Sequence, residues 1–412
     1  MSFWKEVKLK EVTSLIKRVI APKYVETDGY PIINQKCIRD NTVSYENSKL
    51  INKSQRVNKE KYLQDGDILV NSTGTGTLGR VAQYKFIGDN IFCDTHVSIV
   101  RANDTVDKDF LAYQLSYKES MIENYGKGAT NQIELASSDL GLLKIQFPSL
   151  SIQKKIAQVL SNYDELIENN FKRIKLLEES ARLTYEEWFL RFRIDGKKLE
   201  IDSGTDLPFG WKKVRSDQVL DVNIGKTPPR GEVEWFTGNN KGIKWISIKD
   251  MKKSSTYIFK TSEEITMDGV SKFNMNIAKK DTVILSFKLT VGEVRIVTED
   301  MVTNEAIAHM NIKNNSILFK EYIFLYLKSF NFDTLGSTSS IGTAINSKIV
   351  KAMPIIVPSK EVMKELKKVI TPLFISIENL QKQNQFLQEA RDILLPRLMT
   401  GMIDVDNMEV AV

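Results

Sequence analysis

The chain has few of the residues from which catalytic and metal sites are built. Its 412 residues include only two cysteines and two histidines. Cys37 and Cys93 cannot form a disulfide framework, and so low a cysteine count is typical of a reducing compartment. His96 and His309 lie in strand-like surroundings, and a lone histidine is more often a packed residue than a catalyst. Because no His/Cys cluster has the spacing of metal ligands, we expect no metal site in this chain.

Long apolar runs are also absent. The longest, Tyr322 to Leu327, is too short to span a bilayer, and the N-terminal stretch Met-Ser-Phe-Trp-Lys-Glu has no apolar signal core. The formal net charge of +6 permits nucleic-acid binding without arguing for it, because many enzymes are equally basic. These features predict a soluble, cytoplasmic protein of about two to three domains.

Two glycine-containing stretches resemble nucleotide-binding motifs, but neither has the context that such motifs require. Gly74-Thr-Gly-Thr-Leu-Gly79 matches the G-x-G-x-x-G pattern, and Asp94 follows 20 residues after its first glycine. The segment 80–87 is too short and too rich in β-formers to be the helix that must come next, so a loop between strands is the better interpretation. Gly225-Lys226-Thr227 resembles the end of a P-loop, but Leu220 replaces the first glycine and two prolines follow.

Motifs for catalysis are missing as well. Thr227-Pro-Pro-Arg230 lacks the leading polar acceptor and the closing aromatic ring of the motif found in amino-group methyltransferases. There is no Gly-x-Ser-x-Gly elbow and no clear pair of carboxylates with a lysine at nuclease spacing. The sequence therefore predicts a protein that is not catalytic by itself.

The strongest pattern is a heptad repeat between residues 151 and 190. Apolar residues recur there in alternating steps of four and three, with Lys, Arg and Glu between them. If helical, this segment is about 60 Å long at ~1.5 Å per residue, and its apolar seam needs a partner. The predicted seam residues are Ile156, Leu160, Tyr163, Ile167, Asn170, Ile174 and Leu177.

A second seam, 210 positions later, is the predicted partner. Its residues are Leu366, Ile370, Leu373, Ile377, Leu380, Asn384 and Leu387. Pro148 and Pro358 mark a switch from strand to helix at the same offset, Ser359 is the expected N-cap, and Pro372 predicts a local kink. The polar residues Asn170, Asn384 and Arg391 are candidates for fixing the register of the pair. Alternatively, the seam broadens there and they face a partner subunit or solvent.

The segments before the two helices also match each other. Trp4 corresponds to Trp211 at an offset of 207, Asp67 to Asp281 at 214, Gly79 to Gly292 at 213, and Asp109 to Glu321 at 212. Their order is colinear, and a drift of a few residues is what loop insertions produce in a duplicated domain. Expected strands over 67–70 and 97–100 and an expected helix over 109–118 make the unit α+β. The sequence thus predicts two copies of one α+β unit.

Loops rich in Gly, Ser, Thr, Asn and Lys occupy matching places in both halves. Small hydroxyls and backbone amides suit phosphate oxygens, while Lys, Arg, Asn and Gln can read base edges. Any one of these loops could be a simple turn, but their register in both halves favours a paired ligand surface. Arg80, Lys127, Lys226, Arg230 and Lys288 are the leading candidates. The full set of candidate DNA-binding residues is Ser72, Thr73, Thr75, Thr77, Arg80, Lys127, Thr130, Asn131, Gln132, Lys226, Thr227, Arg230, Lys288, Ser340, Thr343 and Asn346.

Together these features resemble the specificity subunit of a type I restriction–modification system. The resemblance is carried by Leu207-Pro-x-Gly-Trp211, Gly225-x-Thr-Pro228, Thr303-Asn304-Glu305, Gly336-Ser-Thr338, Pro148, Pro358 and the terminal Leu394-Leu-Pro-Arg-Leu-Met-Thr-Gly401. The chain departs from the family pattern in its first copy, which has Cys93-Asp94-Thr95 in place of Thr-Asn-Gln and Val19-Ile-Ala-Pro22 in place of Gly-x-Thr-Pro. In the second copy Glu305 replaces the Gln.

The resemblance implies an α+β fold. Two globular target-recognition domains of duplicated fold would be separated by two long antiparallel coiled-coil helices, with pseudo-twofold symmetry. The implied parts are a first recognition domain over 1–150, a central helix over 151–195, a second recognition domain over 196–358, a C-terminal helix over 359–402 and a tail over 403–412.

The resemblance also implies a division of labour. Each domain would read one half of an asymmetric bipartite DNA site, and the helices would set the spacing and dock two methyltransferase subunits, with restriction-motor subunits outside them. Catalysis would belong to these partners, together with S-adenosylmethionine, ATP and Mg, and this chain would hold no cofactor. One alternative is a scaffold protein without DNA affinity, whose coiled coil holds two ligand-binding domains. Another is a self-sufficient enzyme that binds S-adenosylmethionine at the Gly74 loop.

Overall fold

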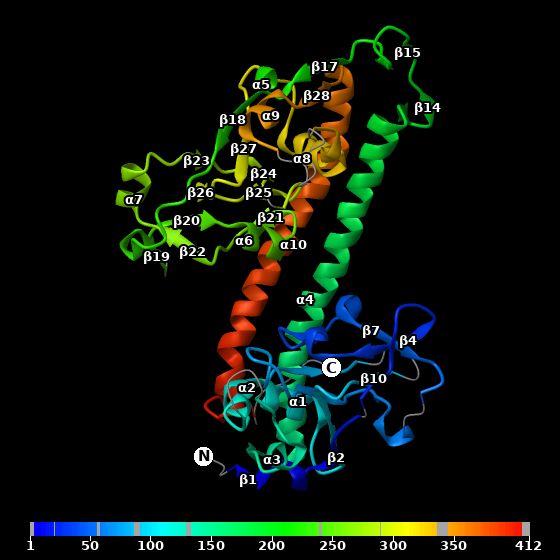
Figure 1. The fold of residues 1–412 in the computed structure, drawn as a ribbon, viewed down its shortest axis with the longest axis vertical. Coiled ribbons are helices and arrows are strands. Elements are labelled where there is room, and N and C mark those ends of the chain that lie inside the picture. Colours follow the sequence, from blue (N-terminus) through cyan, green and yellow to red (C-terminus); the bar gives the residue numbers. More distant parts are fainter. Residues whose placement is uncertain are drawn as a thin grey trace. The chain divides into compact units, whose positions relative to one another are not determined.

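The computed structural model describes residues 4–19, 21–55, 58–85, 91–128, 133–238, 241–288, 290–335 and 345–405. The chain divides into two compact units, one formed by residues 1–167 with 387–412 and the other by residues 168–386. Each unit combines an α/β domain with a section of each of two long helices (Figure 1). No helix in the described part of the chain is both long and apolar enough to cross a membrane.

The two long helices are α4 (Leu150–Tyr185) and α10 (Lys360–Met399). One π-helical turn, Glu186–Leu190, extends α4 to the end of the predicted heptad segment. Ser359 caps α10 as expected, because its Oγ accepts the backbone N–H of Val362 at 3.3 Å. Pro372 lies inside α10, which continues through it as a single helix.

The helices run antiparallel within each unit. In the first unit Ile156 and Leu160 of α4 share a core with Leu398 and Met399, near the end of α10. In the second unit Ile174 shares a core with the beginning of α10. The beginning of one helix therefore meets the end of the other, as the sequence predicted. All the predicted seam residues that follow are buried or half-buried: Ile156, Leu160, Tyr163, Ile167, Asn170, Ile174, Leu177, Leu366, Ile370, Leu373, Ile377, Leu380, Asn384 and Leu387.

The polar residues of the seam contact residues of the facing helix. Asn170 Nδ2 donates to Asn384 Oδ1 at 3.0 Å, and both side chains are buried. Arg391 Nη1 donates to Asp164 Oδ1 at 2.6 Å. Because a register shift would separate these pairs, the contacts favour the hypothesis that polar residues fix the register.

Within its described residues the first domain contains two four-stranded sheets and two strand pairs, one of them β5 (Ile38–Arg39) with β6 (Thr42–Val43). The first sheet is antiparallel, in the order β2 (Thr13–Arg18), β11 (Val97–Ala102), β8 (Ile68–Asn71) and β9 (Val81–Gln83). The second has the order β10 (Phe92–Cys93), β4 (Gly29–Ile33), β7 (Lys49–Asn52) and β3 (Tyr24–Val25). β1 (Lys5–Lys8) pairs with β12 (Lys144–Phe147), which leads into α4.

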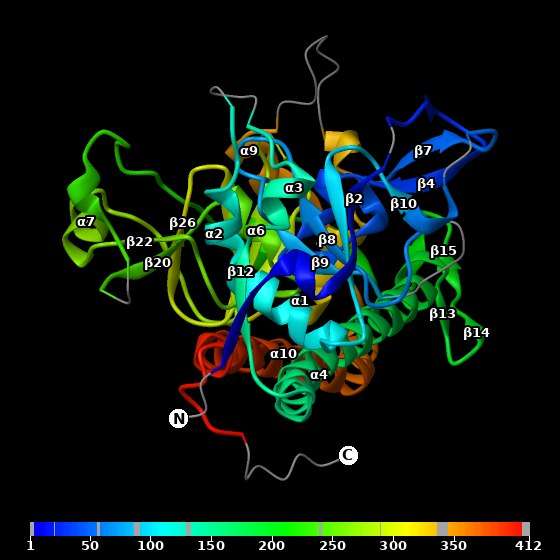
Figure 2. The same cartoon turned by 90° about the horizontal axis from the view of Figure 1, so that it is seen from below.

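The helix α1 (Lys108–Tyr117) joins the first domain to α4. Its Tyr113 hydroxyl donates to Asp164 on α4, and both views of the ribbon show the two helices side by side (Figures 1 and 2). Asp107 caps α1 by accepting the N–H groups of Asp109 and Phe110. The short helices α2 (Glu119–Glu123) and α3 (Ser137–Leu140) complete the domain.

The second domain repeats this arrangement. One sheet has the order β18 (Leu220–Ile224), β27 (Ile307–Ile312), β24 (Val283–Ser286), β25 (Val294–Val297) and β21 (Tyr257–Ile258). The other has the order β19 (Phe236–Thr237), β22 (Glu263–Ile265), β20 (Ile243–Ile246), β26 (Met301–Thr303) and β23 (Ile277–Ala278). β17 (Lys212–Arg215) pairs with β28 (Pro354–Val357), which leads into α10, and α8 (Lys320–Ser329) and α9 (Ser347–Ala352) match α1 and α3.

Backbone hydrogen bonds relate the two domains residue by residue. Gly79 N–H donates to the carbonyl of Asn71 at 2.9 Å, and Gly292 N–H donates to the carbonyl of Ser286 at 3.0 Å. Both glycines have a positive φ, of 87° and 92°, which is unfavourable for other residues. Gly79 therefore corresponds to Gly292, as predicted, and Asn71 corresponds to Ser286.

This register corrects one predicted match. Asn71 and Ser286 are 215 positions apart, so Asp67 corresponds to Thr282 rather than to Asp281. Asp67 is buried and pairs with Arg101 at 2.7 Å, whereas Asp281 is an exposed turn residue with φ 70°. The likeness of two aspartates misled the alignment, because a sheet register is fixed by which side chains are buried.

The seam and the outer face of α4 can be told apart by mutation. Ile174 is 3% exposed and Leu176, two residues later, is 70% exposed. We expect Ile174→Ala to lower the free energy of unfolding by about 2–5 kcal/mol, since it leaves a cavity. Leu176→Ala, the matched control, should change it by less than about 0.5 kcal/mol. Urea denaturation followed by circular dichroism measures both, and equal losses would contradict the assignment of the seam.

Candidate nucleic-acid interface

The Gly74 loop of the first domain connects two antiparallel strands. It leaves β8 at Asn71 and enters β9 at Val81, and no helix opens after Gly79. The interpretation of this stretch as a loop between strands is therefore correct, and the cofactor-binding helix required by the alternative is absent from it.

The candidate residues of this loop differ in their exposure. Thr75 is exposed, whereas Thr73 is half-buried with its Oγ1 2.6 Å from Nδ1 of His96. Thr77 Oγ1 donates to the carbonyl of Thr73 at 3.1 Å, and Arg80 Nη2 donates to the carbonyl of Gly76 at 2.7 Å. The half-buried Arg80 side chain therefore lies against the Gly74 loop, to which its hydrogen bond attaches it.

Ser72 is a correction to the candidate set. Its side chain is fully buried, its Oγ lies 2.6 Å from Oγ of Ser98, and it donates to the carbonyl of Val70. A hydroxyl so placed stabilises the packing of β8 against β11 and cannot reach a ligand outside the domain. Polar character alone did not separate it from its exposed neighbours.

Lys127 is the remaining candidate of the first domain among the described residues, and it lies near α3. Lys127 Nζ is 3.0 Å from the carboxylate of Asp139, but most of its side chain is exposed. Its backbone forms an isolated bridge with Glu134. Thr130, Asn131 and Gln132 lie outside the described residues.

In the second domain the candidates Lys226 and Thr227 follow β18. Gly225 brings them close to the turn after β26: a Cβ at this glycine would lie 2.1 Å from Oγ1 of Thr303 and 2.2 Å from the carbonyl oxygen of Asn304. Only glycine fits so tight an approach. Lys226 Nζ donates to the carbonyl of Asn274 at 2.9 Å, and Thr227 Oγ1 donates to the carboxylate of Glu305.

Arg230 is held at the edge of the second sheet by three side chains. Its Nη1 lies 2.9 Å from both carboxylate oxygens of Glu263. Its Cζ lies 4.5 Å from the ring centroid of Phe236 and 4.6 Å from that of Trp245. The guanidinium is thus positioned by a carboxylate and by aromatic rings, yet about half of its side chain stays exposed.

The remaining candidates of the second domain are less constrained or have a structural role. Lys288 is exposed, with its Nζ 5.6 Å from the ring centroid of Phe287. Asn346 caps α9, because its Oδ1 accepts the N–H groups of Lys348 and Ile349. Ser340 and Thr343 lie outside the described residues.

The two domains share a turn between corresponding strands that was not in the candidate set. Asp94 Oδ1 accepts the N–H of His96 at 2.8 Å, and Asn304 Oδ1 accepts the N–H of Ala306 at 3.0 Å. Cys93-Asp94-Thr95 therefore corresponds to Thr303-Asn304-Glu305. The backbone is the same, but the side chains that the turns present differ in charge.

The charge of these turns is set by their neighbours. Burial raises the pKa of Asp94 and outweighs its hydrogen bonds from His96 and Tyr24. Burial also raises the pKa of Glu305, but the hydroxyl of Thr227 and the charges of Lys288 and Arg230 lower it more, so this pKa is below its usual value. Glu305 therefore stays ionised beside two of the candidate cations.

An aromatic ring with a cation beside it occurs at the same place in both domains. Tyr24 pairs with Ile51, and Phe236 pairs with the corresponding Ile265. Lys49 Nζ lies 4.5 Å from the centroid of the Tyr24 ring, just as Arg230 lies against Phe236. The Tyr24 hydroxyl also donates to Asp94 at 3.1 Å, and the ring is 44% exposed. Sequence reasoning missed Tyr24 and Lys49, because only the pairing of β3 with β7 brings them together.

Comparison with known proteins decides the family. A sequence model described as "Type I restriction modification DNA specificity domain" matches residues 1–179 and again 208–389, which is more than half of the chain. The chain belongs to the type I restriction–modification DNA specificity family. The two matched segments confirm the predicted duplication and the resemblance stated from the sequence.

Individual relatives of the specificity family agree. The type I restriction enzyme MjaVIII specificity subunit of Methanocaldococcus jannaschii is 24% identical, over 98% of this chain and 94% of its own length. The HindI specificity subunit of Haemophilus influenzae is 24% identical, over 98% of this chain and 100% of its own. The solved S subunit of a type I system from M. genitalium has a similar fold, with 18% identity, a TM-score of 0.59 and 96% of each chain covered.

Membership of the specificity family states the role of the chain. A specificity subunit recognises the DNA sequence within the restriction–modification complex and is not itself the catalytic component. The alternative of a scaffold protein without DNA affinity, whose coiled coil holds two ligand-binding domains, gains no support from these relatives. Among the described residues, no group of three or more His, Cys, Asp or Glu is placed to hold a metal ion.

The histidines of this specificity subunit have different surroundings. His96 is exposed in the short turn between β10 and β11, so strands flank it while the residue itself lies outside them. His309 is buried in β27, with its Nε2 2.7 Å from Oγ1 of Thr303, and burial lowers its pKa to about 4. Val97 pairs with Asn71, and Ile307 pairs with the corresponding Ser286, so Val97 corresponds to Ile307. Two residues further along the strand, His309 corresponds to Ile99 of the first domain. It is a packed residue.

The buried His309 predicts a dependence of stability on pH. Its folded pKa of about 4 lies below the ordinary value of 6.5, so the unfolded chain binds the proton first and stability falls as the pH drops from 6.5 to 4. His309→Ile introduces the residue found at the corresponding position of the first domain, Ile99, and should remove this pH dependence of stability. Between pH 7.5 and 5.0 the wild type should lose about 2 kcal/mol more unfolding free energy than the variant. Parallel losses in urea denaturation at the two pH values would contradict this.

Proposed function

We propose that each domain of this specificity subunit reads one half of an asymmetric, bipartite DNA site. The observation that carries the proposal is the shared turn with its neighbouring aromatic ring and cation, which has one backbone geometry and two sets of side chains. The first domain offers Thr95, Tyr24 and Lys49, with Asp94 buried behind the Tyr24 hydroxyl, and the second offers Asn304, Glu305, Phe236 and Arg230 at or beside the corresponding positions. The same frame with different donors and acceptors is suited to reading different bases.

The exposed cations divide into two kinds under this proposal. Arg230 and Lys49 are held against rings and carboxylates, so they are the candidates for contacts with bases. Lys127 and Lys288 have long exposed side chains on loops, which favours contacts with phosphates. The exposed Glu305 would accept hydrogen bonds from base amino groups rather than approach the phosphate backbone, whereas Asp94 is buried and positions the Tyr24 hydroxyl.

We further propose that α4 and α10 fix the spacing between the two half-sites. Each helix contributes residues to both compact units, and the seam pairs are matched in register by Asn170 with Asn384 and by Arg391 with Asp164. A helix pair with a fixed register holds the two half-sites at one separation, because sliding of one helix along the other would expose apolar seam residues. The proposed parts remain recognition domains over 1–150 and 196–358, helical spacers over 151–195 and 359–402, and a tail over 403–412.

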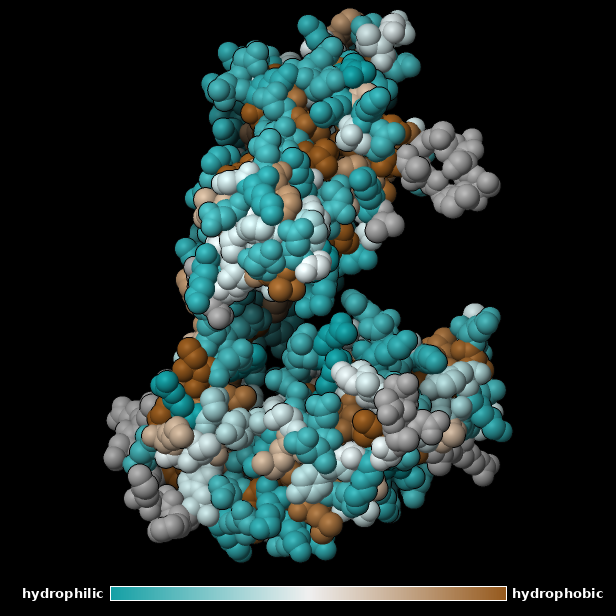
Figure 3. Space-filling view, turned by 60° about the vertical axis from the view of Figure 1, so that its left-hand side comes forward, coloured by the Kyte–Doolittle hydropathy of each residue, from teal (hydrophilic) through white to brown (hydrophobic). Residues whose placement is uncertain are grey.

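The outer faces of the two helices are proposed to dock methyltransferase subunits. Large apolar residues stay exposed on these helices although the seam is already covered, and they include Leu166, Phe171, Leu176, Leu183, Val369, Ile375, Phe386 and Ile393. On the face drawn in Figure 3 the surface is mainly hydrophilic, with hydrophobic side chains in small groups. A repeated apolar face on paired helices is suited to further helices.

The rest of the assembly follows from this arrangement. Two methyltransferase subunits would supply adenine methylation with S-adenosylmethionine, and restriction-motor subunits would supply ATP- and Mg-dependent cleavage, leaving this chain without a cofactor. Cys37 and Cys93 are both free and buried, which fits assembly on DNA in the reducing cytoplasm.

The methylation pattern of host DNA tests the proposed function. When the chain is expressed with its methyltransferase subunits, methylated adenines should map to two dissimilar half-sites at one fixed separation. The half-sites should differ because corresponding positions carry Lys49 and Glu263, or Thr95 and Glu305. A perfect palindrome, or a variable separation, would contradict it.

Single variants refine the same measurement, with the unchanged half-site as internal control. Lys49→Ala should relax the sequence preference in one half-site only, and Arg230→Ala in the other only. A base contact is worth about 1–3 kcal/mol of discrimination. A phosphate contact would instead weaken all sequences alike and lower the salt slope by about one, which would move these residues out of the reading role.

The docking face is tested by co-purification. Leu176→Glu should abolish association with the methyltransferase subunits, because it places a charge in an apolar contact, while circular dichroism and thermal stability stay as in the wild type. Phe209→Glu is the matched control, since Phe209 is 63% exposed outside both helices. If both variants retained the methyltransferase subunits, the proposed docking face would be wrong.

A further inference from the structure

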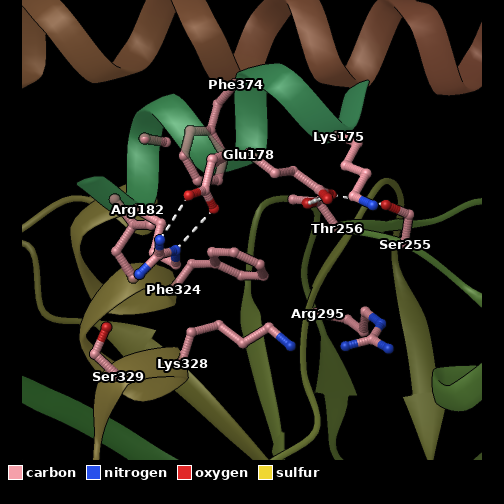
Figure 4. A pocket seen from close by; sticks show the side chains of 13 residues that line it. Lys175, Glu178, Arg182, Ser255, Thr256, Arg295, Phe324, Lys328, Ser329 and Phe374 are labelled. Atoms are coloured by element: carbon pink, nitrogen blue, oxygen red, sulfur yellow. Dashed lines mark hydrogen bonds and ion pairs between the residues drawn. The ribbon is translucent and has the colours of Figure 1, made fainter. Parts of the chain in front are cut away.

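The second unit contains a pocket that DNA reading does not use. Its volume is about 510 Å³, within the range of small-molecule sites, and it lies between α4, α8, α10 and β25 (Figure 4). It is lined by Lys175, Glu178, Glu179, Ala181, Arg182, Ser255, Thr256, Arg295, Phe324, Leu325, Lys328, Ser329 and Phe374. Four of these residues are cationic and two are acidic, so the lining carries a net positive charge.

Arg295 is the most deeply placed cation of this pocket. It comes from β25 and is only 7% exposed. Its Nε donates to the carbonyl of Ser254 at 2.9 Å, its Nη1 donates to the carbonyl of Val294 at 2.7 Å, and its Nη2 pairs with Glu293 at 3.0 Å. These bonds use three of the five N–H groups of the guanidinium and hold it rigidly, leaving two for a ligand.

Lys328, at the end of α8, extends into the same cavity (Figure 4). Within the described part of the chain it has no hydrogen bond or ion pair of its own. Although the residue is exposed overall, partial loss of water contact and then the charge of Arg295 lower its pKa, while the charges of Glu293 and Glu178 partly offset this. Two cations that share a pocket repel each other, and an anion bound between them would remove that cost.

The two glutamates of the lining are occupied by other partners. Glu178 Oε1 accepts the hydroxyls of Ser255 at 2.7 Å and of Thr256 at 2.6 Å. Glu179 accepts from the guanidinium of Arg182, at 2.6 Å and 2.9 Å. Neither carboxylate pairs with Lys328, and this ammonium, like that of Lys175, is available to an incoming anion within the described part of the chain.

This combination belongs to the second domain alone. Val81 pairs with Val70 in the first domain, and Val294 pairs with the corresponding Leu285 in the second, so Val81 corresponds to Val294. The next residue along each strand is Ala82 in the first domain and Arg295 in the second. The residue that corresponds to Lys328 is Ser116, since α1 and α8 match at an offset of 212. The fold therefore does not require cations at these two positions.

We propose that this pocket binds a phosphate ester, with the phosphate between Lys328 and Arg295 and the rest of the molecule along the apolar wall of Phe324 and Leu325. The phosphate could belong to a free nucleotide or to the backbone of bound DNA, since both present the same group. Phosphate oxygens accept the paired N–H groups of arginine and the ammonium of lysine.

Calorimetric titration of the purified full-length chain with AMP tests this proposal. AMP should bind saturably, inorganic phosphate more weakly, and adenosine without phosphate should not bind. Lys328→Ala should weaken AMP binding by about tenfold or more, and Lys328→Arg should largely restore it. Lys320→Ala is the matched control, because Lys320 is on the same helix, pairs with Asp281 and does not line the pocket.

Absence of saturable AMP binding would overturn the proposal, and so would equal weakening by Lys328→Ala and Lys320→Ala. Adenosine binding as tightly as AMP would also overturn it, since the phosphate would then contribute nothing. Competition with a random-sequence duplex identifies the source of the phosphate: displacement of AMP from the wild type indicates backbone phosphate, and undisturbed binding indicates a free nucleotide.

Discussion

The pairing of the apolar seams on α4 and α10 is the contact on which the rest of the structure depends. Each seam is covered by the other helix and by the cores of the α/β domains, which contribute residues such as Trp211 and Phe110 to the same clusters. Burial of the apolar side chains holds the two helices together, but by itself it does not prevent one helix from sliding along the other. The buried amides of Asn170 and Asn384 remove that freedom, because a buried amide without a partner costs about 1–3 kcal/mol.

The two domains show how one frame carries two chemistries. Backbone hydrogen bonds of the sheets, positive-φ glycines and the Asx turn after β10 or β26 recur at corresponding places, and these features determine the fold. The side chains on that frame are much less alike: a histidine packs where the other copy has isoleucine, and an arginine where it has alanine. The shared backbone features maintain the fold in both copies, while the side chains placed on that backbone are able to differ.

The parts of the structure that could be predicted from sequence are those encoded by local periodicity. The heptad steps predicted both long helices and their seam, and the glycine and proline landmarks predicted the duplication. The alignment of Asp67 with Asp281 was wrong by one residue because it compared side-chain chemistry, whereas the register of a strand is fixed by which of its side chains are buried. The candidate loops were found from their polar composition, which could not distinguish the buried Ser72 from the exposed Thr75.

The residues that sequence reasoning missed share a different property. Tyr24 and Lys49 are far apart along the chain and meet only because β3 pairs with β7. The contact of Tyr24 with Asp94, whose turn the family resemblance had indicated, likewise depends on the pairing of β10 with β4. No periodicity encodes such a meeting, since it depends on pairing between distant strands. The pocket around Arg295 and Lys328 is also non-local, because its walls come from two helices of the spacer pair and from a sheet of the second domain.

The strand pairs β1–β12 and β17–β28 have a consequence for how such chains can evolve. In each domain the strand that precedes the two sheets, β1 or β17, lies beside the strand that leads into the long helix, so the polypeptide enters and leaves the sheets at neighbouring points. A segment with adjacent ends can be exchanged for another by recombination at two short flanking stretches, without threading or refolding the remainder. Each domain is therefore built as a replaceable cassette, and one crossover at each border would give a hybrid molecule with a new combination of halves.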